Sequence, residues 1–329
     1  MPRIGLVLGA GGVVGHAFHA GVLAAVAEST GWDPRDADVI VGTSAGSVVG
    51  ALLRAGASAP DIAAKATGSP LSSEGRLLVA RAEAGRVDLP PIPSRPARRR
   101  VPAMSAPGAL ARAALQPWNA RPGPLAAAFL PAGSVPTELV AASLRPLFTT
   151  WPEAALWINA VQLDSGRRVT FGRDPGFETT VADAVAASCA IPAFFAPVVI
   201  DGVRYVDGGV HSLTNAELLA GLELDLVVVS SPMSIAGAGL RVAADQPARR
   251  LARFTLGREV AKVRRGGTPV LTFQPDGADI AVMGLNAMEE SRRAPVTRRT
   301  FESTLRRFDS SRAADEIAIL RSSATSRPA

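Results

Sequence analysis

The chain has 329 residues, of which 47% are hydrophobic and 19% are charged. This composition fits one large globular domain or two smaller ones, and it excludes a fibrous, coiled-coil or disordered protein. The single cysteine, Cys189, excludes an intrachain disulfide and a cysteine-rich zinc site. The formal net charge of +6 favours anionic partners without indicating which kind.

The N-terminal region contains a long apolar segment. Residues 4–27 include no Lys, Arg, Asp or Glu, so by length they could span a bilayer. Six glycines and two histidines argue against a membrane span. A signal peptide is also unfavourable, because Arg3 alone would supply its positively charged N-terminal region. We therefore expect a strand at residues 3–8, a glycine loop, and a helix at residues 14–29 that ends near Gly31.

Further along, short apolar strands alternate with helical stretches, a pattern typical of a mainly parallel sheet covered by helices. A helix at residues 45–55, stopped by Gly56, follows the second strand. The remaining expected strands are residues 37–41, a hairpin of 156–163 and 168–171, and the buried strands 224–230 and 269–273. The remaining expected helices are residues 180–188 and amphipathic stretches within 287–321.

Residues 68–136 differ in composition from the rest of the chain. They hold 12 of the 26 prolines and nine arginines against three acids, so they carry the whole net excess of +6. We expect little regular structure here. Two interpretations stay open, a solvated loop and a mobile lid that meets an anionic membrane surface. Nucleic acid is not the expected partner, because no recognition motif or stacking aromatics accompany the arginines.

Residues 42–46, Gly-Thr-Ser-Ala-Gly, match the G-x-S-x-G pattern between a predicted strand and a predicted helix. That context indicates a nucleophile elbow with Ser44 at its tip. The flanking Gly42 and Gly46 are needed because a side chain there would collide with neighbouring backbone. The helix N-terminus behind Ser44 adds backbone amides to the site. An ordinary glycine-rich turn is the alternative.

A nucleophilic serine needs a proton acceptor. The only histidine after Ser44 is His211, and the other candidate is Asp207, which ends an apolar strand and precedes Gly208 and Gly209. An exposed aspartate, with a pKa of about 3.9, is a poor base, so Asp207 would have to be buried. The residues alone leave both acceptors open.

Residues 9–15, Gly-Ala-Gly-Gly-Val-Val-Gly, are suited to form an oxyanion hole, because backbone amides are unobstructed at glycines. A nucleotide-binding loop fits poorly. No lysine follows as a P-loop requires, and Val14 stands where a dinucleotide fingerprint has glycine.

In this order, the three blocks resemble the patatin-like phospholipase family, whose members are lipid acyl hydrolases with a Ser–Asp dyad. The resemblance covers residues 4–56 and 156–231, through the motifs GLVLGAGGVVG, VGTSAGS, ASCAIPAFFAP and VRYVDGG. It implies a three-layer α/β/α fold with a mainly parallel central sheet. We expect one catalytic domain over residues 1–321, interrupted by the insertion at 68–136, and a flexible tail at 322–329.

The resemblance also implies the roles of the site residues. Ser44 is the nucleophile, Asp207 is the general base, and the amides of Gly11, Gly12 and Val13 bind the oxyanion. No histidine is needed, and we expect no metal and no cofactor. The remaining motif positions are the glycines Gly9, Gly15, Gly42, Gly46, Gly208 and Gly209.

The chain departs from the family at Val14, where many members carry Arg or Lys, and in a loop that lacks an unbroken glycine triplet. Both departures bear on substrate choice rather than on reaction type. In the apolar segment 188–197, Ile191, Phe194 and Phe195 are candidates for an acyl-chain pocket, with ordinary core as the alternative.

The predicted function is hydrolysis of carboxylic esters in phospholipids, lysophospholipids or related acyl lipids through an acyl-enzyme. The alternatives are an acyltransferase or transesterase with the same dyad, acting in specialised metabolism, and a non-catalytic lipid-binding protein on the same scaffold. The expected partners are an acyl lipid and, peripherally, an anionic membrane. We expect a cytoplasmic protein without a signal peptide or transmembrane helix.

Overall fold

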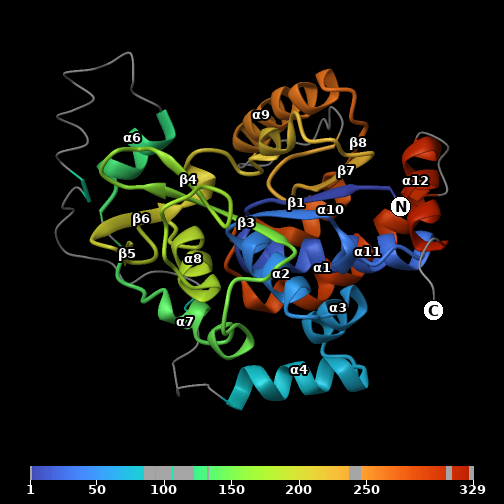
Figure 1. The fold of residues 1–329 in the computed structure, drawn as a ribbon, viewed down its shortest axis with the longest axis horizontal. Coiled ribbons are helices and arrows are strands. Elements are labelled where there is room, and N and C mark those ends of the chain that lie inside the picture. Colours follow the sequence, from blue (N-terminus) through green and yellow to red (C-terminus); the bar gives the residue numbers. More distant parts are fainter. Residues whose placement is uncertain are drawn as a thin grey trace.

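The computed structural model describes residues 2–84, 93, 105–106, 122–131, 133–236, 246–308 and 313–325. The proline and arginine clusters at residues 90–91 and 98–100 lie outside these ranges, so the expectation of a lid there stays untested. The described residues form an eight-stranded sheet in the order β5-β6-β3-β2-β1-β7-β8, with β4 paired to β3 (Figure 1). The strands are β1 Ile4–Leu8, β2 Val39–Thr43, β3 Ala155–Gln162, β4 Arg168–Phe171, β5 Val198–Ile200, β6 Val203–Asp207, β7 Leu226–Ser230 and β8 Val270–Phe273.

The centre of the sheet is parallel, from β3 through β2, β1 and β7 to β8. The edge beyond β3 is antiparallel, since β4 and β6 both run against β3 and β5 runs against β6. Side chains of each central strand alternate between two cores. In β1, Leu6 and Leu8 pack into one core and Val7 into the other. Strands buried on both faces explain the continuous apolar runs in the sequence.

Helices cover both faces of this sheet, which confirms the three-layer α/β/α architecture (Figure 1). One face carries α1 Gly12–Thr30, α2 Ala45–Arg54, α3 Ala59–Thr67, α8 Val181–Ser188, α11 Arg293–Phe308 and α12 Ala314–Thr325. The other face carries α9 Gln246–Arg265 and the short 3-10 helix η5 Ala216–Leu219. The remaining α-helices are α4 Ser73–Ala84, α6 Pro122–Phe129, α7 Glu138–Ala141 and α10 Gly277–Met283.

The apolar N-terminal segment is part of the core of the fold. β1 lies between β2 and β7, and α1 ends at Gly31, which adopts the left-handed conformation (φ 73°) and caps the helix on the Ala27 carbonyl. The predicted strand, loop and helix are therefore confirmed. No helix in the described ranges is long and apolar enough to cross a membrane.

Two expectations differ from the structure. Regular structure is not sparse throughout residues 68–136, because α4 and α6 lie within that range. α4 can form because the stretch between Pro70 and Pro90 contains no proline. The last helix, α12, extends to Thr325, so the part of the expected tail at residues 322–325 is helical, and residues 326–329 lie outside the described ranges.

Candidate active site

The register of the sheet brings the predicted motifs to one edge. Leu8, at the end of β1, pairs with Gly42 near the end of β2, so the glycine loop and the serine turn leave the sheet side by side. Across β3, Thr43 pairs with Asn159, and the next residue of β3 pairs with Asp207 at the end of β6. Sequence segments far apart in the chain therefore meet at the carboxyl ends of the parallel strands.

Ser44 occupies the strained turn that the motif predicts. Its backbone has φ 53° and ψ −120°, a left-handed conformation that side chains other than glycine rarely adopt, and the residue is 3% exposed. A methyl group at Gly42 would lie 2.5 Å from the Cα of Ser47, and one at Gly46 would overlap the carbonyl of Leu8. Gly42 is therefore needed for the start of α2 to turn back over β2, and Gly46 for it to pack against β1.

The side chain of Asp207 lies against that of Ser44. Asp207 is 5% exposed, and burial raises the pKa of its carboxyl from the ordinary 3.8 to about 6. The Gly209 amide donates to Asp207 Oδ1 at 2.7 Å, and this bond and the interaction with the Ser44 hydroxyl act in the opposite direction on this pKa. The carboxylate is thus ionised at neutral pH yet far more basic than an exposed aspartate, as a proton acceptor must be.

Residues 188–190, at the end of α8, hold both members of this pair. The Ser44 amide donates to Ser188 Oγ at 2.9 Å, and the Asp207 amide donates to the Ala190 carbonyl at 3.0 Å. Between them, Cys189 is buried, and burial together with the Asp207 charge raises the pKa of its thiol. Cys189 therefore stays protonated, as expected of a small buried hydrophobe. The role of Ser188 was not evident from the sequence, because serine is common at helix ends.

The glycine loop forms the N-terminus of α1. Gly12 begins this helix with φ +61°, and within the described parts of the chain the amides of Gly11, Gly12 and Val13 have no backbone acceptor. Gly15 packs close to Ala45, the first residue of α2, so the positive ends of two helices converge beside Ser44. These three amides lie at the positive end of a helix, which is the kind of place where proteins bind anions.

Two contacts fix this loop in place. The Ala10 amide donates to the Leu213 carbonyl at 2.7 Å, which ties the loop to the segment after Asp207. His19 is fully buried and bridges the Gly9 carbonyl and Ser230 Oγ, at 2.8 Å each. Burial lowers the pKa of His19 to about 4, so it is neutral and structural. No group of acidic, histidine or cysteine side chains in the described ranges is arranged to hold a metal ion.

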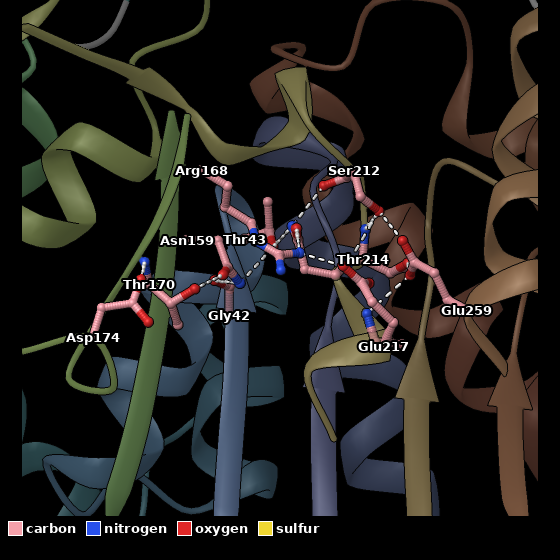
Figure 2. Close-up of polar contacts among 12 residues, drawn as sticks. Gly42, Thr43, Asn159, Arg168, Thr170, Asp174, Ser212, Thr214, Glu217 and Glu259 are labelled. Carbon is pink, nitrogen blue, oxygen red and sulfur yellow. Dashed lines mark hydrogen bonds and ion pairs between the residues drawn. The ribbon is translucent and has the colours of Figure 1, made fainter. Parts of the chain in front are cut away.

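A buried polar network includes Thr43, the residue before Ser44, and was not predicted (Figure 2). Thr43 accepts hydrogen bonds from the amide groups of Asn159 (3.3 Å) and Asn215 (3.1 Å). Asn215 also donates to the Ser212 carbonyl at 2.7 Å. Ser212, Thr214 and the amide of Ala216 all donate to the carboxyl of Glu259 on α9. The network thereby links the serine turn to the loop after Asp207 and to α9.

The charges in this network are distributed unequally. Burial, together with the nearby carboxylate of Glu217, raises the pKa of Glu259 to about 7. Glu217 is half-buried, but its ion pair with Arg168 holds its pKa below the ordinary value. The network therefore carries one ionised carboxylate beside its arginine and a second carboxyl that is partly protonated at neutral pH.

The apolar segment after α8 packs beside the glycine loop. Phe194 and Phe195 are buried together with Val135, and Ile191 and Met288 pack against this cluster. Met288 also lies against Gly12, so the cluster reaches the N-terminus of α1. This position is compatible with an acyl-chain pocket and equally with core.

His211 follows Asp207 by four residues, at the end of the 3-10 helix η4 Gly208–Val210. Its amide donates to the Gly208 carbonyl, and its side chain is half-buried. The shift in the pKa of Asp207 comes from its burial, from the Ser44 hydroxyl and from the Gly209 amide.

The model of the patatin-like phospholipase family matches residues 6–220, which is more than half of the chain. The chain belongs to this family. Patatin-like phospholipases are lipid acyl hydrolases, so at the level of the family this chain is a lipid acyl hydrolase. The match includes the glycine loop, the serine turn and the segment around Asp207, and it ends before β7, α9 and β8.

No curated protein matches this patatin-like chain. Among solved structures, VipD from Legionella pneumophila is similar, with 15% sequence identity and a TM-score of 0.43, over 94% of this chain and 67% of that chain.

Proposed function

We propose that this patatin-like protein is a serine esterase that cleaves carboxylic ester bonds of phospholipids, lysophospholipids or related acyl lipids through a Ser44–Asp207 dyad. The observation that carries the proposal is the buried contact between a serine in a strained turn and an aspartate whose pKa is raised to about 6. A serine in a strained turn without a basic group beside it would indicate only a structural role. A strained serine beside a basic, buried carboxylate has a proton acceptor.

In the proposed reaction, the Ser44 hydroxyl attacks the ester carbonyl carbon while its proton passes to Asp207. The resulting tetrahedral oxyanion accepts hydrogen bonds from the amides of Gly11, Gly12 and Val13. The intermediate collapses, the ester C–O bond breaks, and the alcohol portion of the lipid leaves with the proton from Asp207. Water then attacks the acyl-enzyme, Asp207 takes its proton and returns it to Ser44, and the fatty acid is released.

The segment 188–198 supports a lipid rather than a polar substrate. Ile191, Phe194 and Phe195 belong to an apolar cluster that borders Gly12, where the carbonyl of the substrate would bind. In this proposal they line the acyl-chain pocket, since a fatty chain needs apolar walls close to the scissile bond.

Hydrolysis of a short-chain p-nitrophenyl ester tests the dyad. We expect Ser44→Ala and Asp207→Asn each to lower kcat/KM by about 10³-fold or more, because removing either dyad member leaves only the oxyanion amides and binding. Matched controls are Ser143→Ala and Asp201→Asn, both at exposed positions, which should keep the wild-type rate. Unchanged activity in either dyad variant would overturn the proposal.

Products distinguish hydrolysis from acyl transfer. A panel of phospholipids and lysophospholipids should yield free fatty acid in amounts that do not depend on added alcohols. A fluorophosphonate probe should label Ser44, as mapped by mass spectrometry. Dominant transfer of the acyl group to an added alcohol would identify a transferase, and no labelling would indicate a lipid-binding protein.

A further inference from the structure

Helix α9 has an exposed face that the proposed reaction does not use. Its buried side, with Leu256, Val260 and Val263, packs on the sheet. On its outer side, Leu251 is 66% exposed and Phe254 is 63% exposed, at a spacing that places them on one face of the helix. The exposed charged side chains of residues 250–265 are all basic: Arg250, Arg253, Arg258, Lys262, Arg264 and Arg265.

The positions of these residues follow helical geometry. At 100° per residue, Arg250, Phe254, Gly257, Ala261 and Arg265 fall along one line of the outer surface. Leu251, Arg258 and Lys262 lie on one side of that line, and Arg253 and Arg264 on the other. The two large apolar side chains are therefore surrounded by cations and small residues. The single acid in this stretch, Glu259, faces inward and is buried.

α9 is also joined directly to the active-site edge. Arg249, near its beginning, donates to the carbonyls of Pro232 (2.8 Å) and Ser234 (3.3 Å), which follow the carboxyl end of β7. Pro232 lies in turn close to Gly11 and Gly15 of the glycine loop. Near the middle of α9, Glu259 binds the segment after Asp207. A surface held by α9 is thus close to the edge where the ester would enter.

We propose that the outer face of α9 docks the protein on an anionic lipid bilayer. The arginines and lysine would lie among acidic headgroups, and Leu251 and Phe254 would enter the boundary between headgroups and acyl chains. Charge complementarity selects this occupant, because a face with cations around exposed apolar side chains suits an interface that is both anionic and apolar. The proposal builds on the proposed function, but its test measures binding rather than turnover, so either can fail without the other.

Co-sedimentation of the full chain with vesicles tests this proposal. The wild-type protein should bind vesicles of phosphatidylcholine mixed with an equal part of phosphatidylserine, and it should bind pure phosphatidylcholine vesicles much more weakly. Added salt should weaken binding to the anionic vesicles. Arg258→Gln with Lys262→Gln should lower the affinity about 30-fold.

The matched control changes the same number of charges on another face of the molecule. Arg298 and Arg306 are exposed on α11, which covers the opposite face of the sheet, so Arg298→Gln with Arg306→Gln should bind like the wild type. Leu251→Ser with Phe254→Ser should also weaken binding, while salt dependence is kept. All three double variants should hydrolyse a soluble short-chain ester at the wild-type rate, which shows that they fold.

Three results would overturn the proposal. The first is that the wild-type protein fails to bind anionic vesicles. The second is that the α9 and α11 charge variants lose affinity equally, which would indicate a general charge effect. The third is that Leu251→Ser with Phe254→Ser binds as the wild type does, which would indicate a purely electrostatic face suited to another polyanion.

Discussion

Thr43 and Ser44 are neighbours in the chain, but their side chains lie in contrasting surroundings. Thr43 accepts two hydrogen bonds in a network that runs from Asn159 through Asn215 to Glu259 (Figure 2). Ser44 sits at positive φ, against a carboxyl group whose pKa burial has raised. Thr43 belongs to a network of hydrogen-bonded groups. Ser44 lies beside Asp207, whose charge is costly to bury.

This difference indicates how the fold holds two unfavourable features, the strained turn at Ser44 and the desolvated carboxyl of Asp207. A strained turn and a desolvated aspartate both raise the free energy of the folded state. They persist only where the surrounding structure fixes them, and the buried network, Ser188 and the Ala190 carbonyl provide that support. We therefore expect opposite consequences when the two regions are mutated. Changes in the network should cost stability, and removing the buried charge of Asp207 should cost activity while increasing stability.

The largest effect on stability is expected at Glu259. Glu259→Ala removes the acceptor of Ser212, Thr214 and the Ala216 amide, all of which are buried. Each buried donor left without an acceptor costs about 1–3 kcal/mol, so we expect a loss of about 4 kcal/mol in the free energy of unfolding. Urea denaturation followed by circular dichroism measures this loss.

Glu259→Gln is the matched control, because it keeps an acceptor oxygen of similar size. At acidic pH it should cost much less, about 1 kcal/mol, and this cost should shrink as the pH rises from 4.5 to about 7 and level off above that, because the ionised Glu259 is itself unfavourable in the fold. Equal losses for the two substitutions, or a loss below about 1 kcal/mol for Glu259→Ala, would show that this network is not a support.

A smaller change of opposite sign is expected at Asp207. Its folded-state pKa of about 6 lies above the ordinary 3.8, so between these values the folded state keeps a proton that the unfolded chain has lost. Stability due to Asp207 therefore falls as the pH rises through this window. Asp207→Asn removes the penalty, and we expect it to stabilise the protein by up to about 3 kcal/mol above pH 6.

Thermal unfolding at several pH values checks this expectation. The stabilisation should be full at pH 8 and absent below about pH 3.8. A destabilised Asp207→Asn variant at pH 8 would contradict the comparison, since it would show that the charge of Asp207 is not costly to bury.

Much of the fold was predictable because its signals are local. The strand, glycine loop and helix of residues 4–30 are contiguous, and so are the serine turn and the hairpin of β3 and β4. Ser44 could be named because it follows an apolar strand, between Gly42 and Gly46. Asp207, before Gly208 and Gly209, could be named only as one of two candidate acceptors, and the family resemblance favoured it over His211. The burial and mutual contact of Ser44 and Asp207 required the register across β3, which links residues more than 160 positions apart.

The buried network and the face of α9 could not be predicted for different reasons. Asn159, Asn215 and Glu259 are single polar residues whose partners come from distant segments, so no pattern in the sequence marks them. For α9, the net charge of the sequence gave no indication of a basic surface. The chain outside residues 68–136 is balanced in total, but the fold gathers six cations on one exposed helical face and turns the acid inward.

The central claim, that Asp207 is the base for Ser44, is tested most directly by the pH dependence of kcat/KM for a soluble ester. The wild-type rate should rise about tenfold per pH unit below pH 6 and level off above a midpoint at about 6, the pKa of Asp207 in the folded enzyme. His211→Ala should have the same profile. A midpoint that disappears in His211→Ala, or a rate that does not change between pH 4 and pH 8, would contradict the Ser44–Asp207 dyad.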